Sequence, residues 1–163
     1  SIEADKPADE DLGEVMGFVV ADLDENDVRL GDLISGNKVT MLNYWGTFCG
    51  PCIGEMPYLA ELEKEYKDQG FEILGLTCDI LMPNGSYDDE AIEDARDIMS
   101  STGVDYPILI STAEVNDYIN SEYVPCTIFV DSKGNRIGDE VVGSQEKEEW
   151  EEIIKEKLSS VEE

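Results

Sequence analysis

The sequence predicts an α/β fold in which helices flank one mixed sheet, parallel at its centre and antiparallel at its edge. Two apolar runs, residues 39–45 and 71–77, are each followed by a segment with helical character, as is typical of parallel strands joined by helices. Near the C-terminus, two strands joined by a tight turn add the antiparallel edge. With 163 residues, 41% of them apolar, the chain is long enough for the core of one domain.

The N-terminal part is predicted to consist of a flexible segment and a hairpin. Residues 1–13 are acidic, contain a proline and lack periodicity, so we expect a flexible segment there and a globular domain over residues 14–163. Residues 18–20 and 28–30 flank an Asp-Glu-Asn-Asp turn and predict a β-hairpin extension.

The central elements follow from apolar content and spacing. A short helical turn is predicted at residues 31–34. Both apolar runs are too apolar for half-exposed strands and are therefore placed in the sheet interior. Between the runs, apolar spacing predicts a helix that begins near Ile53 and ends at Gly70, with a kink at Pro57.

The second half of the chain alternates loops with short elements. Asp88 or Asp89 is expected to cap the first helix of this half. Cys126 precedes a strand whose hairpin partner follows a Ser-Lys-Gly-Asn turn. The predicted elements are a loop at 81–87, a helix at 88–101, an extended segment at 107–110, a helix at 113–120, strands at 127–131 and 136–142, and an amphipathic helix at 145–158.

Composition excludes several classes of function. The chain has 39 Asp and Glu against 11 Lys and Arg, a formal net charge of -28, which would repel nucleic acid and anionic lipid surfaces. It contains no histidine, which removes Cys-His and Ser-His-Asp catalysis and His-ligated metal sites. We therefore predict no nucleic-acid partner and no cofactor.

Membrane insertion of this segment is also not predicted. No apolar stretch approaches the roughly 20 residues that cross a bilayer, and no signal peptide is visible. The sequence begins with Ser, so we expect a trimmed or processed form whose export signal or anchor lay upstream.

The motif Cys49-Gly50-Pro51-Cys52 stands between the first apolar run and the helix that follows it. The N-terminus of a helix stabilises a thiolate, which is the reactive form of cysteine. A zinc site needs about four ligands, and only two further cysteines remain, so no metal is predicted. A purely structural disulfide would close too short a loop to stabilise the fold much. The spacing therefore favours a redox-active pair.

The two cysteines are predicted to have different roles. Cys49, at the exposed start of the helix, attacks an incoming disulfide, and Cys52, one turn inside and shielded, then attacks Cys49 to release the partner. Pro51 lacks an N–H and suits the first turn, while Gly50 adds no bulk between the sulfur atoms.

Residues 42–57 resemble the active-site signature of the TlpA/ResA-like thioredoxin-fold thiol-disulfide oxidoreductases, including the Glu-Met-Pro after the second cysteine. Residues 124–131 with Gly134 resemble that family's cis-proline loop and hairpin, and residues 71–77 resemble its second core strand. The likeness covers roughly residues 17–158.

The resemblance implies a thioredoxin fold and a cis peptide bond before Pro125, with the backbone of Val124 presented to an extended substrate chain. It further implies partners that are disulfide- or dithiol-bearing proteins, an upstream electron donor, and a location outside the cytoplasm. The Gly-Pro insert is shared with reducing thioredoxins and favours action as a reductant. A monomer is the default expectation.

Two positions depart from the family. Phe48 stands where the family usually has Trp, which we expect to alter partner contacts more than chemistry. Cys126 replaces a Thr or another small residue. A further cysteine, Cys78, lies near the end of the second core strand. Both thiols are predicted to be buried and inert, the alternative for Cys126 being a thiol that traps Cys49 or a substrate under oxidation. The central strand should separate the two thiols beyond the reach of a disulfide.

Two acids near the pair are candidates for tuning proton transfer. Asp79 follows the second core strand, and Glu55 lies early in the active-site helix. The alternative interpretation is a solvated loop acid for Asp79 and a helix-capping charge for Glu55, and for Glu55 this alternative is favoured.

Two other functions remain open from the residues. A peroxidase of the peroxiredoxin type shares an elaborated form of the fold, but the Pro and Thr expected ahead of its reactive cysteine are missing before Cys49 and Cys52. A non-catalytic binding module would use the cis-proline groove to hold a partner, with the dithiol as a redox-controlled latch.

Overall fold

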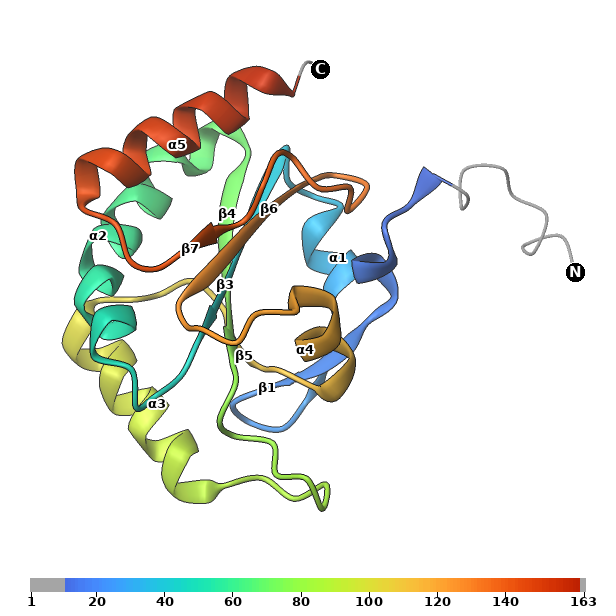
Figure 1. The fold of residues 1–163 in the computed structure, drawn as a ribbon, viewed down its shortest axis with the longest axis vertical. Helices are drawn as coiled ribbons and strands as arrows, with labels where there is room; N and C mark the ends of the chain where they lie inside the picture. The colour runs from blue at the N-terminus through green and yellow to red at the C-terminus, as the bar shows by residue number, and fades with distance from the viewer. Residues whose placement is uncertain (1–10, 162–163) are drawn as a thin grey trace, which may run out of the picture.

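A computed structural model describes residues 11–161, so most of the predicted flexible segment 1–13 lies outside the described residues. One seven-stranded sheet, in the order β2-β1-β5-β4-β3-β6-β7, lies between two layers of helices (Figure 1). Strands β3, β4 and β5 are parallel, and both sides of this centre are antiparallel. This confirms the predicted mixed sheet with its N-terminal hairpin.

The strands are β1 Val19–Asp22, β2 Asp27–Arg29, β3 Val39–Trp45, β4 Phe71–Thr77, β5 Ile108–Ile110, β6 Cys126–Asp131 and β7 Val141–Val142. The helices are α1 Leu30–Ile34, α2 Gly50–Tyr66, α3 Asp89–Thr102, α4 Ala113–Ile119 and α5 Lys147–Ser160, with 3-10 turns η3 Glu14–Gly17 and η4 Lys67–Gln69.

Strand β3 is the centre of the structure. All seven of its residues are buried, and it pairs in parallel with β4 and antiparallel with β6. Its last residue, Trp45, lies opposite Thr77 of β4, and Tyr44 lies opposite Cys126 of β6. The register therefore brings the end of β3, the end of β4 and the start of β6 to one edge of the sheet.

Each face of the sheet has its own core. Helices α2, α3 and α5 cover one face and α1 and α4 the other (Figure 1). Trp45, Met56, Phe129 and Trp150 are among the buried residues of the first core, and Leu42 of the second. Because both faces of the central strands are covered, the apolar runs need no polar alternation, as the sequence predicted.

Several element boundaries differ from the predictions, and two of these differences have a clear local cause. Helix α2 begins at Gly50, three residues before the predicted start, because the Cys49 side chain caps it and Pro51 fits its first turn. The predicted strand 136–142 is interrupted: only Val141–Val142 pairs with β6, and Arg136 forms an isolated bridge with Val130. Between them Gly138 has a φ of 77°, a left-handed conformation that turns the chain out of the ladder.

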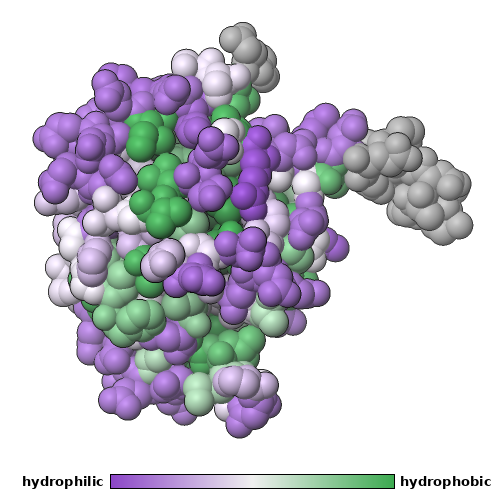
Figure 2. All heavy atoms as spheres, in the orientation of Figure 1, coloured by the Kyte–Doolittle hydropathy of each residue, from purple (hydrophilic) through white to green (hydrophobic). Residues whose placement is uncertain are grey.

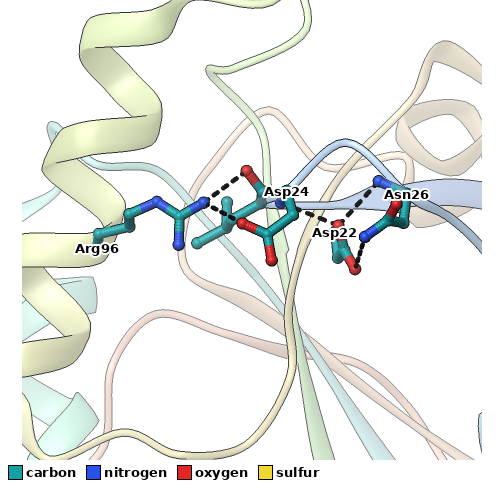
Figure 3. A network of polar contacts seen from close by, with 5 residues as sticks. Asp22, Asp24, Asn26 and Arg96 are labelled. Atoms are coloured by element: carbon teal, nitrogen blue, oxygen red, sulfur yellow. Dashed lines mark hydrogen bonds and ion pairs between the residues drawn. The ribbon is translucent and has the colours of Figure 1, made fainter.

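A polar network joins the N-terminal hairpin to α3 (Figure 3). Arg96 donates through Nη2 to the carbonyl of Leu23 at 2.8 Å and to Oδ1 of Asp24 at 2.7 Å. Asp22 accepts the backbone N–H groups of Asp24 and Asn26 at 2.9 Å and so shapes the hairpin turn. The network holds the hairpin, which lies at one side of the sheet, against the helix layer.

Hydrophilic residues cover most of the face seen in Figure 2, and apolar residues form separate patches between them. Among the described residues there are three ion pairs, all with exposed side chains, so the net charge of -28 is largely uncompensated. Exposed pairs contribute at most about 1 kcal/mol each. Repulsion among the acids therefore dominates the surface electrostatics.

We predict that salt stabilises the fold. Raising NaCl from about 0.01 M to about 1 M shortens the screening length from about 30 Å to about 3 Å, which weakens the repulsion of many acids and the attraction of few pairs. The free energy of unfolding should rise by about 1 kcal/mol or more, which corresponds to roughly 2–4 °C in Tm, when thermal unfolding is measured at pH 7. Near the sequence pI of about 4.1 the gain should largely vanish, and a fall in Tm with salt at pH 7 would contradict this account.

Candidate active site

The two cysteines of the motif form a disulfide where β3 ends and α2 begins. Cys49 is the N-cap of α2, and its Sγ accepts the backbone N–H of Cys52 at 3.2 Å. An N–H aimed at sulfur from the first turn of a helix favours negative charge on that sulfur when the disulfide is reduced. The local fold therefore favours a thiolate on Cys49.

The two sulfur-bearing side chains differ in accessibility. Cys52 is 1% exposed and Cys49 is 6% exposed. Both are therefore buried, which corrects the prediction of an exposed Cys49; the loop before β6 lies against it, and Cys52 is the more deeply buried of the two, as predicted. Gly50 and Pro51, between the cysteines, are both exposed.

The loop that precedes β6 lies against the disulfide. The peptide bond between Val124 and Pro125 is cis, as the resemblance implies. The carbonyl oxygen of Val124 lies 3.7 Å from the Sγ of Cys49. The Pro125 carbonyl accepts the N–H of Gly143 at 2.8 Å, which ties the loop to the residue after β7.

Two exposed aromatic side chains stand beside the residues that meet at Cys49. Phe48, directly before Cys49, is 70% exposed. Its ring lies so close to Gly46 that any side chain larger than glycine at position 46 would collide with the ring. Tyr123, directly before Val124, is 66% exposed. Sequence reasoning missed Tyr123, because an aromatic residue in a loop carries no signal until the loop is seen to lie at the disulfide.

Asp79 anchors the loop that carries the disulfide. Its carboxylate accepts the backbone N–H of Thr47, with both oxygens 3.2 Å from the nitrogen, and also the Thr47 hydroxyl. Asp79 is half-buried and lies two residues after the end of β4. It is therefore a bonded link between the end of β4 and the loop before Cys49, and not a solvated acid.

Glu55 is buried beneath the site, which overturns its interpretation as a helix-capping charge. It is 2% exposed, and its Oε1 accepts the indole N–H of Trp150 at 2.8 Å and the backbone N–H of Gln145 at 3.1 Å. Its Oε2 lies 3.5 Å from Nδ2 of Asn43. Burial raises the pKa of Glu55 above its ordinary value, and the three donors oppose that rise.

Sequence reasoning found Glu55 but not its donors. Trp150 occupies an apolar position of an amphipathic helix and looks like ordinary core. Gln145 donates through its backbone, so its side chain gives no indication. Asn43 lies within a strand whose other polar residue is Thr40, and a buried amide among mainly apolar residues is the one signal that was available.

The two remaining cysteines are free thiols on either side of β3. Burial, and then the charge of Asp79, raises the pKa of Cys78 to about 11. Burial also raises the pKa of Cys126, which is fully buried. Both cysteines are therefore poor nucleophiles at neutral pH, and β3 separates them as expected.

Over residues 11–161, no group of three or more His, Cys, Asp or Glu side chains is placed to hold a metal ion. In the same range no helix is long and apolar enough to cross a bilayer.

Replacing Glu55 by Gln should stabilise the oxidised protein progressively as pH rises. A raised pKa means that the folded chain holds the proton of Glu55 more tightly than the unfolded chain does. The stability that this gives is complete below the ordinary pKa of 4.5, and it is lost as the pH rises through the higher pKa of the folded state. Gln does not ionise and avoids this loss. The difference in unfolding free energy should change by at most about 1.4 kcal/mol per pH unit.

Urea denaturation of both oxidised proteins between about pH 4 and pH 8 measures this difference. Glu63, which is also buried with a raised pKa, is common to both proteins and cancels. A difference that stays constant with pH would show that Glu55 does not titrate differently in the folded chain.

Sequence comparison identifies relatives over most of the chain. The Redoxin family model matches residues 11–154. The thiol-disulfide oxidoreductase ResA of Bacillus anthracis is 31% identical over 144 residues, which cover 87% of this chain and 75% of the relative. The ResA of Geobacillus kaustophilus is 35% identical over 136 residues, covering 82% and 70%.

Solved structures share the fold. A thiol:disulfide interchange protein of the thioredoxin family from Chlorobium tepidum matches with a TM-score of 0.70 at 22% identity, covering 86% of this chain and 92% of that one. StoA from Bacillus subtilis matches with a TM-score of 0.62 at 18% identity, covering 83% and 93%. With a CxxC disulfide at the end of the central strand, this chain belongs to the Redoxin family and is a ResA-like, thioredoxin-fold thiol-disulfide oxidoreductase.

Proposed function

We propose that the protein reduces disulfides of partner proteins through the Cys49–Cys52 dithiol. The observation that carries this proposal is the asymmetry of the pair: Cys49 is the less buried sulfur, caps α2 and accepts the N–H of Cys52. A nucleophile needs access and a stabilised thiolate, and Cys49 has more of both.

In the first step, the Cys49 thiolate attacks one sulfur of the partner's disulfide. A bond forms between Cys49 and that sulfur, the partner's S–S bond breaks, and the second partner sulfur leaves as a thiolate. The extended partner chain lies along the backbone of Val124 and Pro125, as an added strand would. Phe48, Gly50 and Pro51, all exposed beside Cys49, complete the contact surface.

In the second step, Cys52 loses its proton and attacks Cys49. The Cys49–Cys52 bond forms, the mixed disulfide breaks, and the second partner thiol is released. Glu55, one helical turn after Cys52, accepts the Cys52 proton, while Asp79 acts by holding the Thr47 loop. The partner gains two electrons, which a dithiol-bearing donor protein later returns to the pair.

The direction of electron flow and the location are parts of the same proposal. The Gly-Pro insert between the cysteines favours a reductant, as in reducing thioredoxins. A location outside the cytoplasm is supported by one structural relative, a disulfide oxidoreductase of Mycobacterium tuberculosis that is described as secreted and as homologous to DsbE.

The reduction potential of the Cys49–Cys52 pair tests the proposal. Equilibration with glutathione or dithiothreitol buffers, followed by alkylation of free thiols, should show one two-electron transition near -270 mV, about the thioredoxin value. The same transition should persist when Cys78 and Cys126 are both replaced by Ala, because neither belongs to the couple.

A potential close to -120 mV, the region of the oxidant DsbA, would reverse the proposed direction and make the protein a disulfide donor. If the pair shows no reversible transition between these limits, dithiol exchange is not its function.

A further inference from the structure

Helix α5 contacts the buried carboxylate below the disulfide at one oxygen only. Oε1 of Glu55 accepts both donors that α5 and its entry supply, the indole N–H of Trp150 at 2.8 Å and the backbone N–H of Gln145 at 3.1 Å. The Trp150 side chain is fully buried. An indole N–H donates and does not accept, so this contact fits an acceptor oxygen.

The two donors fix which oxygen of Glu55 can carry a proton. If Oε1 carried the proton, its O–H would face the N–H groups of Trp150 and Gln145, which can donate a hydrogen bond but cannot accept one. The proton must therefore reside on Oε2. That oxygen is held weakly, 3.5 Å from Nδ2 of Asn43, since the Asn43 amide also donates to Oγ1 of Thr127 at 3.1 Å.

We propose that Trp150 is a positioning residue of the dithiol chemistry: it holds Oε1 of Glu55 and leaves Oε2 to take up and return the proton of Cys52. The inference rests on the proposed function. Cys52 and Glu55 lie three residues apart on α2, so they share one face of the helix, and both are buried. A donor from a different helix thus orients the group that exchanges protons with the resolving cysteine.

The proton and electron balance of the step is complete. Cys52 transfers its thiol proton to Oε2 of Glu55, and the resulting thiolate forms a bond with Cys49 while the bond from Cys49 to the partner sulfur breaks. The departing partner thiolate then takes one proton, which Glu55 returns directly or through solvent. The dithiol is oxidised by two electrons and the partner is reduced by two.

The residues hydrogen-bonded to Glu55 are uncharged, so Glu55 is the group near Trp150 that titrates. Its neighbour Asn43 on β3, and Thr127 on β6 to which Asn43 donates, carry no charge. Tyr106 is buried, and its pKa is raised by burial and then by the charges of Glu55 and Glu63, so it stays neutral.

The charged groups at the start of α5 are engaged elsewhere. The Glu146 side chain takes part in the capping box of its own helix. Lys147 pairs with Glu61 at 2.8 Å. Neither group is bonded to Glu55, which leaves the buried thiol of Cys52, three residues earlier on α2, as the group proposed to exchange a proton with it.

The test compares two buried tryptophans. Trp150→Phe removes the donor to Glu55, whereas Trp45→Phe removes an indole N–H that has no hydrogen-bond partner among the described residues. Both rings are fully buried. One equivalent of DTNB added to the reduced protein releases one thionitrobenzoate when Cys49 attacks and a second when Cys52 resolves the adduct, so the two steps are seen separately.

We expect Trp150→Phe to shift the pH midpoint of the second release upward by about one unit, because Glu55 loses a donor to its ionised form. The first release should keep the pH profile of the unmodified protein. Trp45→Phe should leave both midpoints in place. In a Glu55→Gln background, adding Trp150→Phe should produce no further shift.

An unchanged midpoint in Trp150→Phe, with only a lower Tm, would overturn the proposal and leave Trp150 a packing residue. If the Phe variant does not fold, benzothienylalanine at position 150 keeps the bicyclic ring and replaces the N–H by sulfur, and the same shift is required of it. Failure of the proposed function is distinguishable, since the unmodified protein would then release no second thionitrobenzoate at any pH.

Discussion

The pairing of β3 on both sides is the constraint on which the rest of the structure depends. Its seven residues are buried and hydrogen-bonded between β4 and β6, so the strand has one register and its end has one position. That position sets where α2 begins and where Cys49 lies. The same register brings Asp79 from the end of β4 and Val124 from the approach to β6 to the disulfide.

Two electrostatic effects then act in opposite directions within one turn of α2. At the start of the helix, the N-terminus and the Cys52 N–H favour negative charge on Cys49. Below it, burial disfavours the charge of Glu55 and raises its pKa, and the donors from α5 limit that rise. The proposed roles of Cys49 as the attacking thiol and of Glu55 as the proton acceptor for Cys52 both follow from these two effects on one helix.

The fold was predictable because its signals are local. Unbroken apolar runs identified β3 and β4, and the Cys-Gly-Pro-Cys motif identified the strand-to-helix junction. The interrupted strand after β6 was missed, since the sequence shows a glycine but not that Gly138 adopts a positive φ. Glu55 was interpreted as a helix-capping charge because its partners Trp150 and Gln145 lie about 90 residues further along the chain, and no local pattern reports such a contact.

In the proposed mechanism, Cys49 attacks the partner's disulfide, and Cys52 then attacks Cys49 to resolve the mixed disulfide. The most direct measurement is mass spectrometry of the adducts formed when reduced Cys52→Ser and Cys49→Ser proteins meet a disulfide-bonded peptide. The account predicts a stable mixed disulfide at Cys49 in the Cys52→Ser protein and little adduct in the Cys49→Ser protein. Preferential trapping at Cys52 in the Cys49→Ser protein would contradict it.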